Sequence, residues 1–123
     1  MPLHIAQNQA DLDQLSEALE GVGERQQSPT GSITFYRYSD RAKQLSRALT
    51  FATLNDPAEA TSFADSCDSL SGVCDALADH VMSPEGRLFW EGKKALLLGL
   101  ADHFHDLAAQ AKKRPAQALL NFS

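Results

Sequence analysis

Between residues 60 and 81, small and apolar residues recur every three or four positions. This recurrence constrains the fold more than any other feature of the sequence. In a helix these positions share one face, and the heptad spacing is typical of a helix packed lengthwise on another helix. Asp56, Pro57 and Glu59 precede the recurrence as a helix-start signal. The sequence therefore predicts a helix over 57–82 whose inner face carries Ala60, Phe63, Cys67, Leu70, Cys74, Leu77 and Val81.

Three other segments also have apolar residues at helical spacing. Asn8 can cap the first, Ser39 or Asp40 can cap the second, and Ser83 with Pro84 opens the last, which Pro115 is expected to end. Gly92 and Gly99 on the last segment predict a tight helix crossing, with a gap that accommodates a ligand as the alternative. We predict an all-α fold, a small four-helix bundle with helices at about 9–20, 40–54, 57–82 and 84–113.

Residues 21–39 are predicted to be a loop because glycine, serine and proline interrupt the helical pattern there. Within this loop, residues 32–38 are rich in β-branched and aromatic side chains, which favour an extended backbone. No second strand pattern lies nearby to pair with them. We therefore predict an extended aromatic arm at about 32–38 that packs on the helices or pairs with another chain.

The chain has 123 residues, of which 43% are hydrophobic and 22% charged, which suits one globular helical domain over 1–123. Residues 115–123 form an apolar tail that is expected to dock on the body or on a partner. The helix over 84–113 is apolar over most of its circumference, which together with the heptad recurrence over 57–82 and this tail predicts a homodimer. No membrane span or signal peptide is recognised, so we expect a cytoplasmic protein.

Neither cysteine chemistry nor a sequence motif indicates an enzyme. Cys67 and Cys74 lie two helical turns apart, too far for a disulfide, and on the inner helix face they are expected to be buried, reduced and inert. No nucleophile elbow, phosphate-binding loop or dinucleotide fingerprint is present. We expect a non-enzymatic protein without a cofactor. A weaker alternative is a metal site, because Asp102, His105 and Asp106 share one side of a predicted helix.

The net charge of −5 is unevenly distributed along the chain. No Lys or Arg lies between Arg47 and Arg87, whereas residues 25–47 are basic and partly aromatic. Three interpretations fit these blocks. The second and third predicted helices pair through opposite charges, or the acidic helix attracts a basic protein. Alternatively, residues 33–47 contact nucleic acid. The acidic net charge disfavours nucleic acid.

We therefore predict an interaction module that binds and modulates a larger protein, as a regulator, inhibitor, immunity protein or adaptor does. A metal- or small-ligand-binding bundle and a nucleic-acid-associated regulator are the alternatives. The predicted partner-binding residues lie in the aromatic arm and on one outward acidic stripe of the helix over 57–82: Phe35, Tyr36, Arg37, Tyr38, Asp68, Asp75 and Asp79.

Overall fold

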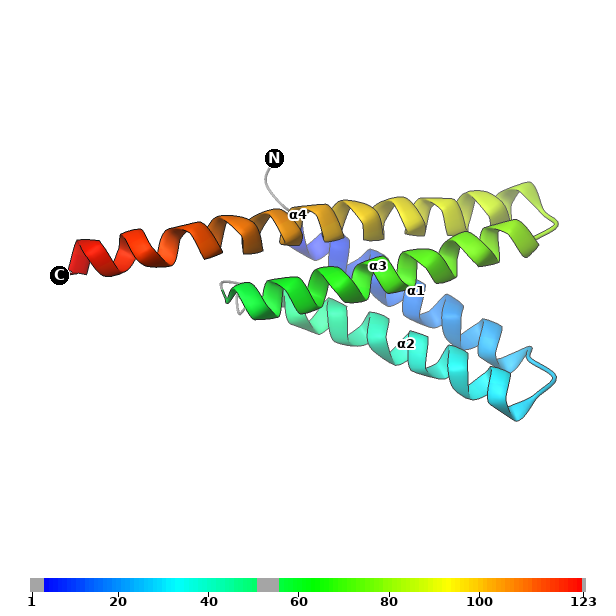
Figure 1. The fold of residues 1–123 in the computed structure, drawn as a ribbon. Helices are drawn as coiled ribbons and strands as arrows, with labels where there is room; N and C mark the ends of the chain where they lie inside the picture. Colours follow the sequence, from blue (N-terminus) through cyan, green and yellow to red (C-terminus); the bar gives the residue numbers. More distant parts are fainter. Residues whose placement is uncertain (1–3, 51–55, 123) are drawn as a thin grey trace. The chain divides into compact units, whose positions relative to one another are not determined.

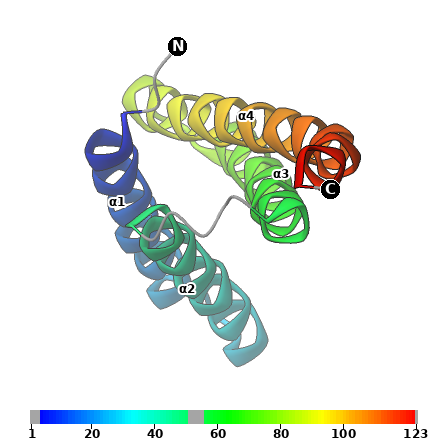
Figure 2. The same cartoon turned by 90° about the vertical axis from the view of Figure 1, so that its left-hand side faces the viewer.

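A computed structural model describes the backbone of residues 4–50 and 56–122 and the side chains of residues 4–49 and 56–110. Over these residues the fold is all-α, as predicted, with four helices and no strand. They are α1 (Ile5–Glu24), α2 (Pro29–Thr50), α3 (Pro57–His80) and α4 (Pro84–Phe122). The chain divides into two compact units, Met1–Phe51 and Ala52–Ser123. Each unit is a helical hairpin, in which α2 runs alongside α1 and α4 alongside α3 (Figures 1 and 2).

A reciprocal pair of serines lies at the centre of the α1–α2 hairpin. The Ser16 hydroxyl donates to the Ser39 carbonyl oxygen at 2.9 Å, and the Ser39 hydroxyl donates to the Ser16 carbonyl oxygen at 2.8 Å. The two hydroxyl oxygens are themselves 2.9 Å apart, and both residues are buried. Side chains this short reach a neighbouring backbone only where two helices lie very close together. The serine pair therefore marks a close helix contact.

The same contact recurs at seven-residue intervals, and we name the set the serine ladder. On one side of Ser39, the Ser32 hydroxyl donates to the Gly23 carbonyl oxygen at 2.8 Å. On the other side, the Gln9 amide donates to the Ser46 carbonyl oxygen at 3.0 Å, and the Ser46 hydroxyl donates to the Gln9 carbonyl oxygen at 3.3 Å. Because residue numbers rise on α2 as they fall on α1, the ladder fixes an antiparallel register. Leu12, Leu15 and Leu19 fill the apolar positions of α1 around it.

The α3–α4 hairpin has an apolar core that follows the predicted heptad recurrence. Leu70 and Leu97 are fully buried, and the rings of Phe63 and Phe104 pack with their centroids 4.5 Å apart. The predicted inner face of α3 is buried from Ala60 to Cys74, while Leu77 is half-buried. The predicted start at Pro57 is confirmed, since the Asp56 carboxylate accepts a hydrogen bond from the Ala58 amide at 2.9 Å.

The predicted extended arm is wrong, because residues 32–38 are helical and belong to α2. Ser28 and Pro29 start this helix just as Ser83 and Pro84 start α4: the Gly31 amide donates to the Ser28 hydroxyl at 3.0 Å. In the helix, the Phe35 and Tyr38 rings stack edge to face at 5.5 Å. Packing and capping therefore outweigh the β propensity of the segment. The predicted loop 21–39 is therefore also wrong: α1 ends at Glu24, α2 begins at Pro29, and only a short turn separates them.

The first helix is longer than its predicted range of 9–20 at both ends. It begins at Ile5 after His4, so the predicted cap Asn8 lies inside it, and neither Gly21 nor Gly23 ends it. The last helix also continues beyond its predicted end at 113. Its backbone is helical through Pro115 to Phe122, and the Ala, Gln and Leu residues of this stretch have high helix propensities. The side chains of the predicted apolar tail lie outside the described part, as does the predicted end of the second helix at 51–54.

The predicted tight crossing at Gly92 and Gly99 is not made with α3. Both glycines are exposed, and a Cβ built at either would meet nothing within 4 Å. Across the described residues, no helix is long and apolar enough to span a membrane.

Gly23 tests how closely α1 and α2 approach. A Cβ at this position would lie 2.9 Å from Tyr36 Cε1 and 3.2 Å from the Ser32 carbonyl oxygen. We expect Gly23→Ala to lower the free energy of unfolding by about 1–3 kcal/mol, the usual cost of overpacking. Gly72→Ala is the control: its Cβ meets nothing within 4 Å, so it should be neutral or stabilising by up to about 1 kcal/mol. Equal melting temperatures for the two variants would contradict the close approach.

Ser16 and Ser39 should show energetic coupling in a double-mutant cycle. Either single change to Ala removes one hydroxyl and costs about 1–3 kcal/mol where a buried polar partner loses its hydrogen bond. The double variant should lose less than the sum of the two single losses, because neither hydroxyl is left behind. Urea unfolding of the four proteins measures the coupling, and strict additivity would show that the hydroxyls do not depend on each other.

Candidate functional site

One edge of the α3–α4 hairpin carries polar pairs between the two helices, and we name it the polar edge. Lys94 Nζ lies 2.9 Å from Asp75 Oδ1. The hydrogen bond to Asp75 and the charge of this carboxylate raise the pKa of Lys94 above its ordinary value. About three helical turns further along α4, His105 Nε2 lies 3.0 Å from Asp68 Oδ2. The polar edge thus contains two pairs between an acid of α3 and a base of α4, Asp75 with Lys94 and Asp68 with His105.

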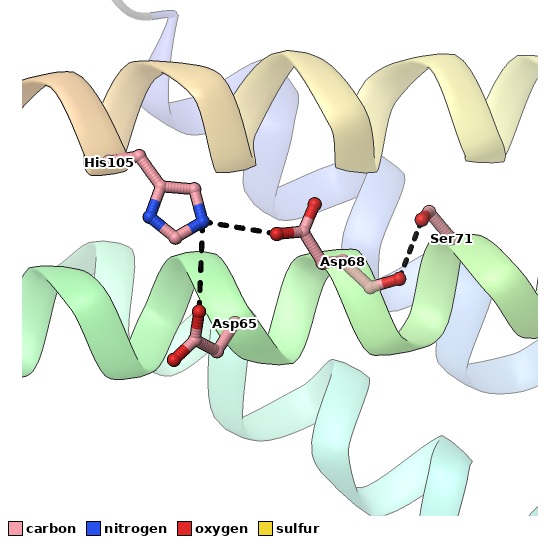
Figure 3. Close-up of polar contacts among 4 residues, drawn as sticks. All are labelled: Asp65, Asp68, Ser71 and His105. Carbon is pink, nitrogen blue, oxygen red and sulfur yellow. Dashed lines mark hydrogen bonds and ion pairs between the residues drawn. The ribbon is translucent and has the colours of Figure 1, made fainter.

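Asp65, one turn before Asp68 on α3, also contacts His105. Its Oδ1 lies 3.7 Å from His105 Nε2, so two carboxylates converge on a single ring nitrogen (Figure 3). One ligand atom from each of Asp65, Asp68 and His105 lies within 4.8 Å of the others. The three side chains are 67%, 49% and 41% exposed, respectively. Two carboxylate oxygens and an imidazole nitrogen are a donor set that divalent cations accept.

The predicted metal ligands Asp102, His105 and Asp106 are not brought together as a site. His105 turns towards α3, whereas Asp102 and Asp106 are exposed and do not belong to the cluster. Asp65 was not among the predicted ligands. The sequence signal that could have identified it is the three-residue spacing between Asp65 and Asp68, which places two carboxylates on neighbouring turns of one helix.

The predicted acidic stripe lies along the polar edge. Asp68 and Asp75 face bases of α4, and the charge of Asp79 also raises the pKa of Lys94. Asp68 and Asp75 therefore have polar partners on α4, the next helix of the same unit. The role of these carboxylates in binding a partner stays a prediction.

The predicted aromatic residues occupy different positions around α2. Phe35 and Tyr38 are half-buried and stack on each other, while Tyr36 packs on Gly23 and Arg37 is exposed. A hollow of about 270 Å³ lies beside the ladder, lined by Glu20, Tyr36, Ser39, Asp40 and Lys43. Because the segment is helical, Phe35 and Tyr38 pack inside the unit while Arg37 faces solvent. The partner-binding role of these residues stays a prediction.

Both cysteines are buried and unbridged, as predicted. Burial raises the pKa of the Cys67 thiol to about 12, and the neighbouring Asp68 charge adds to the effect. Burial likewise raises the pKa of Cys74 to about 12, against a smaller opposing effect of Lys93. Because the thiolate is the reactive form, neither residue suits nucleophilic catalysis.

A second surface feature, which the sequence did not single out, lies at the turn between α3 and α4. We name it the hairpin tip: Met82, Ser83, Pro84, Arg87 and Leu88, which line a hollow of about 380 Å³. The side chains of Met82 and Leu88 are 98% and 69% exposed.

Comparison of the chain with protein-family models, with curated proteins and with solved structures finds no match. Functional inference therefore depends on the residues and their geometry.

The raised thiol pKa values predict slow chemical labelling. At pH 8 the native protein should react with a disulfide reagent such as DTNB far more slowly than the protein unfolded in urea, because fewer thiolates form and access is blocked. Rapid native labelling of two thiols would contradict the burial of Cys67 and Cys74.

The same values predict a loss of stability at alkaline pH. The thiols ionise near 9.0 when unfolded but near 12 when folded, so their contribution is fully present below pH 9 and is lost as the pH rises from about 9 to 12. The double variant Cys67→Ala, Cys74→Ala should show a smaller decline in the free energy of unfolding over this range. Parallel pH profiles for the variant and the unchanged protein would contradict the shifts.

Proposed function

We propose that the protein is a non-enzymatic interaction module that binds and modulates a larger protein through the hairpin tip. The observation that carries the proposal is the exposure of Met82 and Leu88, which both line one hollow. Single exposed apolar residues are common, but two large ones around a concave surface are typical of an interaction site. Covering them would gain about 25 cal/mol for each Å² of apolar surface removed from water.

The chemistry of the tip suggests the kind of segment that it binds. Arg87 lines the same hollow, is exposed and makes no ion pair among the described residues. A guanidinium beside apolar side chains favours a partner with a carboxylate next to apolar residues. The proposed occupant is therefore an acidic, apolar segment of another protein.

The tip is also held in place before binding. The Gly86 amide donates to the Ser83 hydroxyl at 3.0 Å, and a Cβ at Gly86 would lie 2.4 Å from Val81 Cγ1. A turn packed this tightly loses little conformational freedom on binding, which favours affinity. The buried thiols support a binding role over a catalytic one, since the strongest nucleophiles of the chain are withheld from substrates.

The proposal is tested with a peptide library displayed on phage and selected on the immobilised whole chain. We expect enriched peptides to combine apolar residues with Asp or Glu. In fluorescence anisotropy, Leu88→Gln and Arg87→Glu should each weaken their binding at least tenfold. Leu98→Gln is the matched control, because Leu98 is also an exposed leucine of α4 but does not line the hollow, and it should leave binding within twofold.

Three outcomes would overturn the proposal. The first is no enrichment, and the second is enriched peptides that bind the Leu88 variant as well as the original chain. The third is loss of binding in Tyr36→Ala or Asp79→Asn only, which would move the partner surface to the residues predicted from the sequence. Light scattering adds a separate test: a dimer that Leu88→Gln converts to a monomer would show that a second copy of the chain covers the tip.

A further inference from the structure

We infer that Asp65, Asp68 and His105 form a binding site for a divalent transition-metal cation that joins α3 to α4. This function is distinct from partner binding at the hairpin tip. Arg87 and His105 are 18 residues apart on α4, which corresponds to about 27 Å along the helix. The two proposals can therefore fail independently.

The donor atoms come from two helices and meet at one point of the polar edge. Asp65 and Asp68 project from neighbouring turns of α3, and His105 projects from α4 towards both (Figure 3). Zinc binds oxygen and nitrogen at about 2.0–2.2 Å, so ligand atoms around it stand about 3–4 Å apart. The distances from His105 Nε2 are 3.0 Å to Asp68 Oδ2 and 3.7 Å to Asp65 Oδ1, which lie in this range.

The remaining adjustment is small. All three donor atoms already lie within 4.8 Å of one another, and the two carboxylates are exposed enough to rotate. Three protein donors leave at least one coordination position for water, as in sites that exchange their ligands.

Charge at the site also favours a cation. The Asp65 and Asp68 carboxylates bring two negative charges to the single His105 Nε2. A cation would take the lone pair of this nitrogen, with the ring proton on Nδ1. The sequence supplies no Lys or Arg between Arg47 and Arg87, and Lys94 pairs with Asp75. A bound dication would neutralise the carboxylates that converge here.

The mixed donor set selects among metals. Calcium and magnesium prefer oxygen ligands alone, whereas an imidazole nitrogen suits Zn²⁺, Co²⁺ or Ni²⁺. Because the ligands come from both helices, binding should also stabilise the hairpin, since only the folded chain holds all three together. Metal affinity and thermal stability are therefore two separate readouts of one site.

The test is calorimetric titration of the tag-free, full-length chain with Zn²⁺, together with visible absorption spectra after addition of Co²⁺. We expect one equivalent to bind and the melting temperature to rise. His105→Gln and Asp68→Asn should each weaken Zn²⁺ binding at least tenfold and abolish the Co²⁺ spectrum of the site. The matched controls His103→Gln and Asp102→Asn, a histidine and an aspartate of α4 outside the cluster, should bind within twofold of the original chain.

All substituted side chains are partly exposed, so circular dichroism is expected to show unchanged helix content. Binding well below one equivalent would overturn the site. Equal loss in the control variants, or equal affinity in all variants, would show an adventitious ion only. A requirement for Asp102 and Asp106 in place of Asp65 and Asp68 would instead assign the metal to the ligand set predicted from the sequence.

Discussion

The close approach of two helix backbones is the constraint on which the N-terminal hairpin depends. Ser16 and Ser39 exchange hydrogen bonds with each other's backbone, and such bonds form only at one separation and one register. A slip by one turn would break these bonds between the helices and leave the buried hydroxyls only the carbonyl oxygens of their own helix. Leucine packing alone tolerates such shifts far better. The buried serines therefore specify a unique pairing, while the leucines around them supply most of the stabilisation.

Two of the four helix starts were predicted, because capping chemistry is local: Asp56 with Pro57 and Ser83 with Pro84 mark them. Ser28 with Pro29 is the same signal at the start of α2. The prediction took these two residues as part of a loop, because glycines interrupt the pattern around them and β-branched and aromatic residues follow. Propensity for an extended backbone depends on a neighbouring strand, and without one the segment from Ile33 to Tyr38 forms helix, in which the Phe35 and Tyr38 rings pack on each other. The length of α4 was missed because Pro115 weakens a helix without always ending it.

The candidate metal site was only partly predictable, for a different reason. Spacing along α4 drew attention to His105 but paired it with Asp102 and Asp106 of the same helix. The partners observed, Asp65 and Asp68, depend on which residues of α3 lie opposite. That register is set by the packing of Phe63 against Phe104 and of the leucines beyond. A local sequence pattern can identify one ligand of a site, whereas the other ligands depend on which residues tertiary packing places beside it.

The division into two hairpins has a consequence for how the chain folds. In each hairpin the packed helices are joined by a short turn, so interacting residues are close in sequence and little entropy is lost when they meet. Proteins dominated by such local contacts reach the native state in microseconds to milliseconds. Residues 1–51 contain every partner of the serine ladder and can complete it before the rest of the chain has been synthesised. The order of the helices is thus also an order in which structure can form during translation.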